Sequence, residues 1–408
     1  MKILEINKYY YPKRGAERHF LDVIKILRNR GNQVAVFSMH HSKNIESPWN
    51  KYFLSSAGYT SEYGLWEKIK GALRMFYSWE ARKKINKLLD DFQPDVVHIH
   101  NIYHQLSPTI LFQIKKRNIP IVMTVHDFKL INPNHSMFLN GEFYDRCKDG
   151  KFYQCFLDKC VKNSYVKSFL AMLEAYWYNV LGTYRKNIDK YIVPSEFVKN
   201  ILVERGIGEE KIEVLPHFIF ENDLICDEKK SEKKEETYKK PYALYIGALS
   251  KNKGVNDLVD IFKNMKGMEL CVAGGLEDDF QWENFSNTKY LGFLNRSQLN
   301  NVIKKSHCLI SGSRLPETFG LIVLEGLSFG KPFFGFKSGA YQEIVENEVN
   351  GFLAEKKNEL KKALENFSEG RMNFDCEKIK KSARQIYGKE AYFGKLEKIF
   401  EIEILLTK

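Results

Sequence analysis

The chain has 408 residues, of which 44% are hydrophobic and 28% are charged. This length suggests two or three domains with sizeable cores, and the composition excludes a wholly disordered chain and a coiled coil. The formal net charge is +12. It is concentrated in residues 1–220, with 33 basic and 22 acidic side chains, against 30 and 29 in residues 221–408. Such an excess favours an anionic partner: nucleic acid, a membrane surface or a phosphorylated substrate.

Short apolar runs alternate with helical periodicity along almost the whole chain. We expect these runs to be strands covered on both faces, in parallel sheets built from repeated βα units. In the first half they are Lys2–Ile6, Gln33–Ser38, Val96–His100, Pro120–His126, Lys190–Pro194 and Ile212–Pro216. In the second half they are Tyr242–Gly247, Met268–Gly274, Lys289–Leu294, Cys308–Ser313 and Pro332–Phe336. The predicted fold is α/β, with two doubly wound Rossmann-like domains facing a cleft.

Two irregular stretches interrupt this pattern. Residues 128–163 are too long for an ordinary βα connection and predict a structured insertion, followed by one long helix over Ser164–Asn187. Asp227–Lys240 holds eleven charges in fourteen residues, which predicts a solvated linker between the domains. We expect no transmembrane helix, and Glu5 and Lys8 interrupt the apolar core that a signal peptide needs.

Three polar stretches follow predicted strands of the first half. They are Tyr11–Glu17, His98–Asn101 and Thr124–Asp127. Open α/β folds bind ligands at this carboxyl edge of the sheet. The two histidines of the second stretch point to the same face of their strand, and such a pair is also found in metal sites. The histidines therefore predict either ligand-binding residues or hydrogen-bonded core residues.

Residues 66–89 interleave basic and apolar side chains. This pattern favours a helix that lies on an anionic membrane surface, and a packed surface helix with solvated lysines is the alternative. The basic residues are Lys68, Lys70, Arg74, Arg82, Lys83, Lys84 and Lys87. The apolar residues are Trp66, Ile69, Leu73, Phe76, Tyr77 and Trp79.

Three of the seven cysteines lie in the insertion. An odd cysteine count in a long chain favours reduced thiols over a disulfide framework. Cys147, Cys155 and Cys160 are candidate ligands of a structural zinc ion, with His135 as a fourth ligand.

Two constellations stand out in the second half. Lys253 lies at the start of the helix that follows the turn Gly247–Val255, where it would neutralise a diphosphate. Glu317 and Glu325 follow the strand that ends at Ser313. On one helix they would lie about 12 Å apart along its axis, which fits two ends of one extended ligand. Glu325 lies in an apolar run, where an unpaired carboxylate is costly.

Together these motifs resemble glycosyltransferase family 4, a family of retaining enzymes with the GT-B fold. The likeness extends from Gly15–Glu17 to Asn350–Leu353 and is closest to the branch with a cysteine-containing insertion in the N-terminal domain. Its most specific part is Glu317 and Glu325, followed by Gly330-Lys331-Pro332 and Gly339–Val345.

The resemblance implies a division of labour between two domains. Residues 1–216 would form the acceptor-binding domain, with the insertion 128–163 and a C-terminal helix, about 385–408, packed back on it. Residues 217–384 would form the nucleotide-sugar-binding domain.

The resemblance also implies site residues. The catalytic residues would be Glu317, His126 and Lys253. The donor-binding residues would be Glu325, Phe319, Gly320, Leu321, Gly15 and Gly247. The acceptor-binding residues would be Glu17, His100 and Asn101. Charge on the departing diphosphate would be stabilised by Lys253 and the Gly15 turn, so no metal would be required.

The implied activity is transfer of a sugar, with retained configuration, from a UDP- or GDP-linked donor to a glycan or polyprenyl-linked acceptor. This is a hexosyltransferase-type reaction of cell-surface polysaccharide biosynthesis. We accordingly expect a cytoplasmic protein, peripheral on the inner face of the plasma membrane through an anionic contact, with no nucleic-acid partner.

Three departures from the family pattern keep alternatives open. Ala248 stands where an arginine is common, Arg14 stands where a second glycine is usual, and Tyr144 stands where the branch usually has a fourth cysteine. The loss of a diphosphate contact at Ala248 leaves a non-catalytic sugar-nucleotide-binding protein as one alternative. A metal-dependent hydrolase that uses His98, His100 and His126 is another.

Overall fold

The structure is a computed structural model that describes residues 1–56, 71, 73–219, 240–277, 280–283 and 285–407. It divides into two compact units, and each has its own parallel sheet. Unit 1 comprises Met1–Leu139, Tyr144–Leu215 and Phe393–Lys408, and unit 2 comprises Asn140–Phe143 and Pro216–Tyr392. The predicted linker lies outside the described residues except for Lys240. Among the described helices, none has the length and apolar character needed to cross a bilayer.

Unit 1 is built on a six-stranded sheet with the order β2-β1-β3-β4-β7-β8. Every neighbouring pair is parallel. The strands are β1 (Lys2–Ile6), β2 (Gln33–Phe37), β3 (Val96–Ile99), β4 (Ile121–Thr124), β7 (Lys190–Val193) and β8 (Ile212–Val214). All six were predicted from the apolar runs, because strands buried on both faces need apolar side chains at nearly every position.

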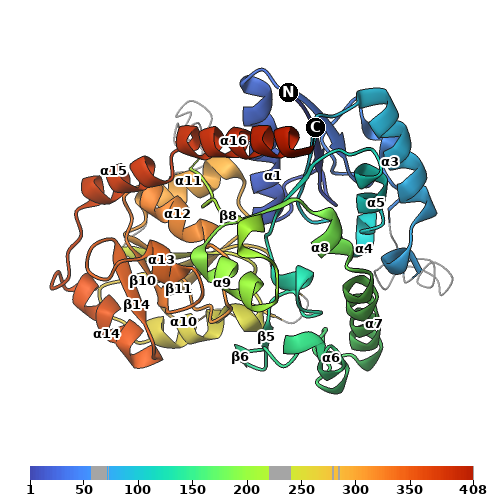
Figure 1. Ribbon diagram of the computed structural model, residues 1–408. Coiled ribbons are helices and arrows are strands. Elements are labelled where there is room, and N and C mark those ends of the chain that lie inside the picture. Colours follow the sequence, from blue (N-terminus) through green and yellow to red (C-terminus); the bar gives the residue numbers. More distant parts are fainter. Residues whose placement is uncertain (57–70, 72, 220–239, 278–279, 284, 408) are drawn as a thin grey trace. The chain divides into compact units, whose positions relative to one another are not determined.

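Helices cover this sheet on both faces. Figure 1 shows α3 and α5 on one side of the strands of unit 1 and α1 and the C-terminal helix α16 on the other. The helices are α1 (Gly15–Asn29), α3 (Trp79–Phe92), α4 (Tyr103–Leu106), α5 (Ile110–Lys115), α6 (Tyr153–Leu157), α7 (Tyr165–Leu181), α8 (Thr183–Asn187), α9 (Glu196–Glu204) and α16 (Lys389–Thr407).

The predicted long helix over Ser164–Asn187 is two helices. Gly182 adopts the left-handed conformation (φ 61°), which ends α7 and begins α8. A left-handed residue breaks the helical path, and glycine adopts that conformation at no steric cost. Before α7, the insertion contains α6 and two short strands, β5 (Phe138–Leu139) and β6 (Glu142–Phe143).

Unit 2 has a second six-stranded parallel sheet with the order β11-β10-β9-β12-β13-β14. The strands are β9 (Tyr242–Ile246), β10 (Glu269–Ala273), β11 (Thr288–Gly292), β12 (Cys308–Ile310), β13 (Phe333–Phe336) and β14 (Gly351–Ala354). The first five were predicted. The apolar runs did not predict β14, because only three of its residues have apolar side chains and charged residues follow it directly.

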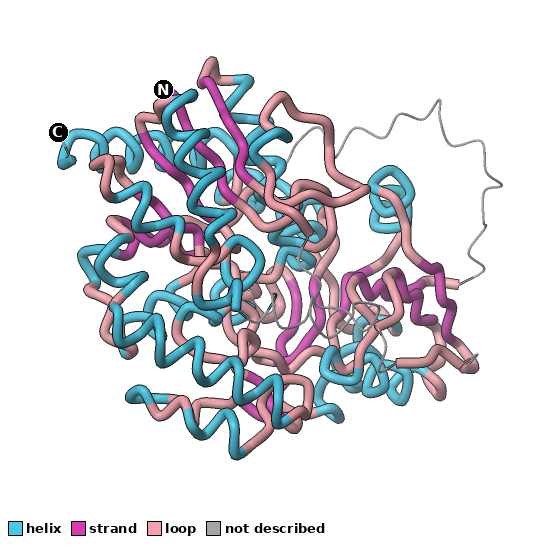
Figure 2. Tube along the Cα trace, turned by 90° about the vertical axis from the view of Figure 1, so that its right-hand side faces the viewer, coloured by secondary structure: helices cyan, strands magenta, loops and turns pink. Residues whose placement is uncertain are grey.

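The helices of unit 2 alternate with these strands, and two apolar cores form, one on each face of the sheet. In Figure 2 the strands run side by side within each sheet, with helices packed beside them. The helices are α10 (Val255–Phe262), α11 (Arg296–Lys305), α12 (Leu321–Ser328), α13 (Tyr341–Ile344), α14 (Lys357–Ser368) and α15 (Cys376–Ile386). The structure therefore confirms two Rossmann-like doubly wound units.

The C-terminal helix α16 belongs to unit 1 from Phe393 onward. Glu397 pairs with Arg30 at 2.9 Å and accepts a hydrogen bond from Asn32 at 3.1 Å. Phe400 is fully buried, and its ring meets the ring of His98 edge-on, with centroids 5.3 Å apart. Apolar contacts of the last helical turns therefore close one face of the first sheet.

We predict that Phe400→Ala destabilises unit 1 by about 3–5 kcal/mol, because it leaves a cavity in a filled core. Leu405→Ala on the same helix removes a side chain that is 72% exposed and should change stability little. Urea denaturation of the full chain measures both. Equal effects of the two substitutions would contradict the packing described for α16.

Candidate functional site

The candidate donor site lies in unit 2, where the strand order changes direction between β9 and β12. At such a switch point the loops that follow the two strands leave the sheet in opposite directions and open a crevice for a ligand. The loop after β9 carries Lys253, and the loop after β12 carries Glu317. Two residues that are 64 positions apart in sequence are thereby brought together.

Lys253 and Glu317 form a half-buried ion pair. Lys253 Nζ donates to Glu317 Oε1 at 2.7 Å, and Ser313 Oγ donates to the same oxygen at 3.2 Å. The two loops touch closely at Gly254 (φ 67°), where an added Cβ would lie 1.9 Å from the carbonyl oxygen of Gly312. Only glycine tolerates both the conformation and this approach, so Gly254 fixes Lys253 next to Glu317.

Glu317 does not lie on the helix that carries Glu325. Helix α12 begins at Leu321, after Gly320 in a left-handed conformation (φ 101°), so Glu317 lies in the preceding loop. The predicted placement of Glu317 and Glu325 on one helix is therefore wrong. A Cβ on Gly320 would lie 2.4 Å from the Tyr341 ring, which explains why glycine stands at this turn.

Glu325 is held by a partner that the sequence did not reveal. Arg296 Nη1 on α11 donates to Glu325 Oε1 at 2.9 Å, and the Glu325 side chain is 18% exposed. This pairing accounts for a carboxylate in an apolar run, as the burial argument required. Ser313 was also missed as a partner of Glu317, because neither contact is visible in the sequence spacing.

The other predicted donor-binding residues of unit 2 surround the same loops. Phe319 is 3% exposed, and its ring packs edge-on against His217. Gly247 follows β9, and Leu321 begins α12. The first backbone N–H groups of α12 have no partner within the helix, which makes its start suitable for an anion.

In unit 1 the predicted histidines converge at the carboxyl edge of the sheet. His98 lies on β3, His100 follows it, and His126 follows the neighbouring strand β4. His100 Nδ1 lies 2.8 Å from His126 Nε2. Glu5 on β1 joins them, with its two carboxylate oxygens 2.9 Å from His98 Nδ1 and 3.2 Å from His100 Nε2. Glu5 was not predicted as a site residue, although a charged residue in a buried strand was a signal.

His126 is partly buried and lies beside His19, His100 and Asp127. Burial lowers the pKa of His126 to about 4 against the opposing charge of Asp127, so the imidazole is neutral at neutral pH. His19 on α1 packs edge-on to His126, with ring centroids 5.4 Å apart. His19, His100 and His126 thus form one cluster, and Glu5, His98 and His100 form a second that shares His100.

The predicted acceptor residues are largely buried in unit 1. Glu17 on α1 is 3% exposed, Asn101 is 4% exposed and His100 is fully buried. Among the described residues, Asn101 Oδ1 has no hydrogen-bond partner. Gly15, which begins α1, is exposed. The direct contact of His100 with an acceptor stays a prediction. In this structure its two ring nitrogens lie within hydrogen-bond distance of His126 and Glu5.

The cysteines of the insertion depart from the expected reduced state. Cys155 and Cys160 form a disulfide bond, and Cys147 is a buried thiol whose Sγ donates to the Tyr144 hydroxyl at 3.8 Å. Burial raises the pKa of Cys147. A zinc ion needs thiolates, and the disulfide removes two of the three thiol ligands that we considered.

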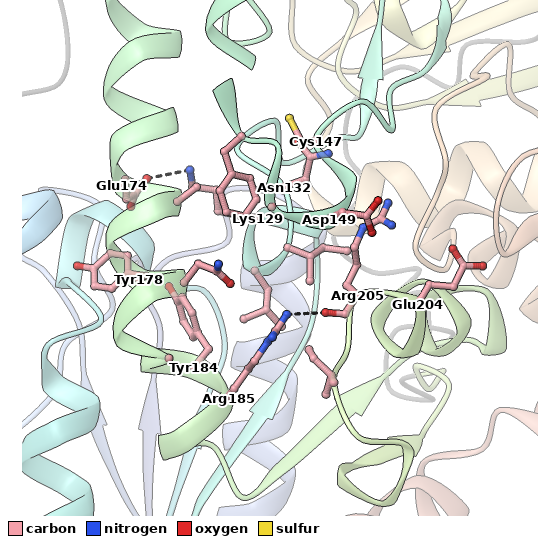
Figure 3. Close-up of a pocket in the computed structure, with 18 of the residues that line it drawn as sticks. Lys129, Asn132, Cys147, Asp149, Glu174, Tyr178, Tyr184, Arg185, Glu204 and Arg205 are labelled. Carbon is pink, nitrogen blue, oxygen red and sulfur yellow. Dashed lines mark hydrogen bonds and ion pairs between the residues drawn. The ribbon is translucent and has the colours of Figure 1, made fainter. Parts of the chain in front are cut away.

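A cavity of about 370 Å³ lies in unit 1 beside the insertion. Figure 3 shows Lys129, Glu174, Arg185, Tyr184 and Arg205 around it. None of the predicted catalytic, donor-binding or acceptor-binding residues lines it. Its volume falls in the range of small-molecule sites.

Its wall contains a buried ion pair. Lys129 Nζ lies 2.8 Å from Glu174 Oε2, and the two side chains are 8% and 3% exposed. His104 Nδ1 lies 3.0 Å from the other carboxylate oxygen. Burial raises the pKa of Glu174, but the neighbouring charges of Lys129 and His104 outweigh it and hold the pKa at about 2.

We predict that Lys129→Met destabilises the protein by about 3–5 kcal/mol, because it leaves a buried carboxylate without its cation. The paired Glu174 contributes stability above its unfolded pKa, near 4.5, and loses it as the pH falls toward 2. Thermal unfolding from neutral to acid pH should therefore show a smaller pH dependence in this variant.

The double variant K129M/E174Q is the control, since it removes both charges and should recover part of the lost stability. Lys151→Met, at a mostly exposed lysine of the insertion, should behave as the unsubstituted chain. A Lys129→Met protein that melts as Lys151→Met does would contradict the assigned ion pair.

The family model described as Glycosyltransferase Family 4 matches residues 13–221, and that of Glycosyl transferases group 1 matches residues 227–386. An uncharacterized glycosyltransferase of Methanocaldococcus jannaschii is 28% identical over 408 residues, covering 95% of this chain and 98% of its own.

Two solved structures share the fold. The lipopolysaccharide outer core galactosyltransferase WaaB has a TM-score of 0.61 at 16% identity, covering 98% of this chain and 99% of its own. Anabaena HepE in complex with UDP has a TM-score of 0.66 at 15% identity, covering 98% of this chain and 100% of its own. The two family models together span most of the sequence, and the second of the two Rossmann-like units carries Glu317 and Lys253 side by side. The chain therefore belongs to glycosyltransferase family 4, whose enzymes have the GT-B fold.

Proposed function

We propose that this glycosyltransferase transfers a hexose from a UDP- or GDP-linked donor to a glycan or polyprenyl-linked acceptor, with retention of the anomeric configuration. The pairing of Lys253 with Glu317 at 2.7 Å carries the proposal. It places a cation and a carboxylate at the switch point of the unit 2 sheet, where one can meet a diphosphate and the other a sugar hydroxyl.

Glu325 and the start of α12 complete the donor site in this proposal. Glu325, held by Arg296, accepts hydrogen bonds from the ribose hydroxyls, and Glu317 accepts from hydroxyls of the transferred sugar. Backbone N–H groups at the start of α12 and the Lys253 ammonium stabilise the diphosphate. Because these groups supply the positive charge, the proposed reaction requires no metal ion.

The chemical step is a substitution at the anomeric carbon. Its bond to the oxygen of the β-phosphate breaks as the acceptor oxygen forms a new bond to the same carbon on the same face. The acceptor's proton passes to the leaving phosphate oxygen, so the products are a glycoside and a nucleoside diphosphate. Lys253 lowers the barrier because negative charge grows on the diphosphate as the bond breaks.

The fold of HepE, whose structure holds UDP, and of the galactosyltransferase WaaB supports a nucleotide-sugar donor and a role in cell-surface glycan synthesis. Neither likeness distinguishes uridine from guanosine. A panel of nucleotide sugars, scored by thermal shift and by mass spectrometry of the released nucleotide, tests the donor. A protein that neither binds nor cleaves any member of the panel would contradict the proposed function.

We predict that Glu317→Gln lowers kcat by about 10²–10³-fold, because it removes a charge that stabilises the transition state. Nucleotide affinity should not change measurably, since Lys253 and Glu325 remain. Glu355→Gln is the matched control, because Glu355 is an exposed carboxylate paired with Lys337 in the same unit. Transfer at the unsubstituted rate by the Glu317 variant would remove this residue from the mechanism.

We also propose that unit 1 contacts an anionic membrane. Of the stretch 66–89, residues 66–70 and 72 lie outside the described chain. The remainder presents Leu73, Tyr77 and Trp79, which are 64%, 37% and 73% exposed. The exposed lysines Lys83 and Lys87 follow on α3. Apolar side chains beside cations suit the interface of an anionic bilayer.

Helix α7 extends this surface. Its exposed apolar residues recur at helical spacing, which forms one stripe on one side of the helix. They are Val166, Phe169, Leu173, Trp177 and Val180. The ring of Trp177 meets that of Phe76 edge-on at 6.3 Å, so the stripe is continuous with residues 73–79. An exposed apolar area of this kind is typical of an interaction surface.

We predict salt-sensitive binding to vesicles that contain phosphatidylglycerol, and none to phosphatidylcholine alone. Charge reversal in K83E/K87E should weaken the binding, whereas Lys381→Glu, at an exposed lysine of α15, should not. Trp177→Ala should weaken the binding that remains at high salt. Co-sedimentation that is indifferent to all three changes would refute the membrane contact.

A further inference from the structure

The cavity of unit 1 has no part in the proposed reaction. Its wall is formed by the insertion, α7, α8, β7 and the end of α9, and all of these residues belong to unit 1. Its volume of about 370 Å³ is many times what one water molecule needs. A cavity of this size, with aromatic rings beside a few polar groups, suits a small organic molecule.

Two side chains of the wall carry buried hydrogen-bond donors without a partner. Neither the Tyr191 hydroxyl nor Arg205 Nη1 makes a hydrogen bond within the described part of the chain. Tyr191 is fully buried, and the Arg205 side chain is 8% exposed. A buried donor without a partner is costly, so a native fold that keeps two of them at one cavity indicates a bound acceptor group.

The groups next to these donors add positive charge. Arg205 is paired with Asp145 through Nη2, which leaves Nη1 for another acceptor. Arg185 donates to the Arg205 carbonyl oxygen, as Figure 3 shows. Burial raises the pKa of Tyr191, and the charge of Arg185 acts against this rise, which places the second guanidinium close to the phenol. Helix α8, β7 and the end of α9 thus bring two cations and a hydroxyl together.

The acidic residues of the wall do not cancel this positive charge. Glu174 is already paired with Lys129 at 2.8 Å, on the α7 side of the cavity in Figure 3. Asp149 and Glu204 are 66% and 58% exposed and each pairs with an exposed lysine, so water and these lysines screen them. The buried part of the wall at Arg205 therefore favours an anion.

We propose that this cavity binds a small organic anion, whose carboxylate or phosphate oxygens accept hydrogen bonds from Arg205 Nη1 and the Tyr191 hydroxyl beside the charge of Arg185. A guanidinium group forms strong hydrogen bonds with both kinds of anion. None of the predicted donor-binding or acceptor-binding residues lines the cavity, so the proposal does not depend on the proposed transfer reaction.

Water is the competing occupant of the cavity. Water molecules would satisfy the same donors, but they would not make the protein distinguish an anion from a neutral molecule. Tyr191→Phe separates binding from folding, because it removes the hydroxyl, keeps the ring and breaks no hydrogen bond within the described residues. We expect the ligand-free variant to be at least as stable as the unsubstituted chain.

The first experiment compares three sugars of similar size with the full chain, by isothermal titration calorimetry and by thermal shift. Glucose 1-phosphate carries a phosphate, glucuronic acid carries a carboxylate, and glucose is the neutral control. At least one of the two anions should bind and raise the melting temperature as its concentration rises, whereas glucose should not. The anion that binds identifies the preferred group. Binding of neither anion, or equal binding of glucose, would overturn the proposal.

The second experiment assigns the binding to this cavity. Tyr191→Phe should weaken the binding of the anion about 10-fold. Arg205→Lys should weaken it about 10–100-fold, because lysine keeps a charge beside Asp145 but lacks the second guanidinium nitrogen. Tyr153→Phe and Arg146→Lys are matched controls at side chains of the insertion that are 45% and 59% exposed, and both should bind as the unsubstituted chain does.

Lys253→Met distinguishes this cavity from the proposed donor site. It removes the cation of the donor site, so it should impair sugar transfer and leave the binding of the anion unchanged. Binding that Lys253→Met abolishes, or that Tyr191→Phe and Arg205→Lys leave unchanged, would overturn the proposal. A chain that passes these binding tests but transfers no sugar would contradict the proposed function alone.

Discussion

Both units depend on the pairing of carboxylates with nitrogen-bearing side chains of neighbouring elements, from the loop after β12, from α12 and from β1. Glu317 is paired with Lys253, Glu325 with Arg296, and Glu5 with two histidines. A carboxylate without a partner in such surroundings would cost several kcal/mol. The pairs therefore restrict which elements can approach each other. Glu317 and Glu325 stay partly exposed, whereas Glu5 is fully buried.

The parallel sheet explains why the functional groups gather. In each of the two six-stranded sheets all strands run in the same direction, so the residues that follow the strands share one edge. In unit 2 this edge brings the loop after β9 to the loop after β12, and Gly254 allows the close approach. In unit 1 it brings Glu5, His100 and His126 together from β1, β3 and β4. The fold positions the side chains, and the neighbouring groups determine their chemistry.

Each of the wrong predictions was made from a pattern along the sequence that does not report the local backbone conformation. The helix over Ser164–Asn187 was expected to be continuous because its apolar periodicity runs through Gly182, and periodicity does not report a single left-handed residue. Glu317 was placed on the helix of Glu325 for the same reason, although that helix begins at Leu321, after the left-handed Gly320. The cysteines were expected to be reduced from their number alone, and the pairing of Cys155 with Cys160 depends on a local turn that number does not describe.

The sequence by itself determined eleven of the twelve strands of the two large sheets, the α/β class and the family. It could do so because strands buried on both faces require continuous apolar runs, and because the motif residues keep their spacing. Only the tertiary structure decided the partners of the site residues. Arg296 and Glu5 are 29 and 93 residues away from Glu325 and His98, which they bind, and Ser313 reaches Glu317 only through the path of the loop after β12. Their roles follow from strand order and register, which place side chains from separate βα units within hydrogen-bond distance.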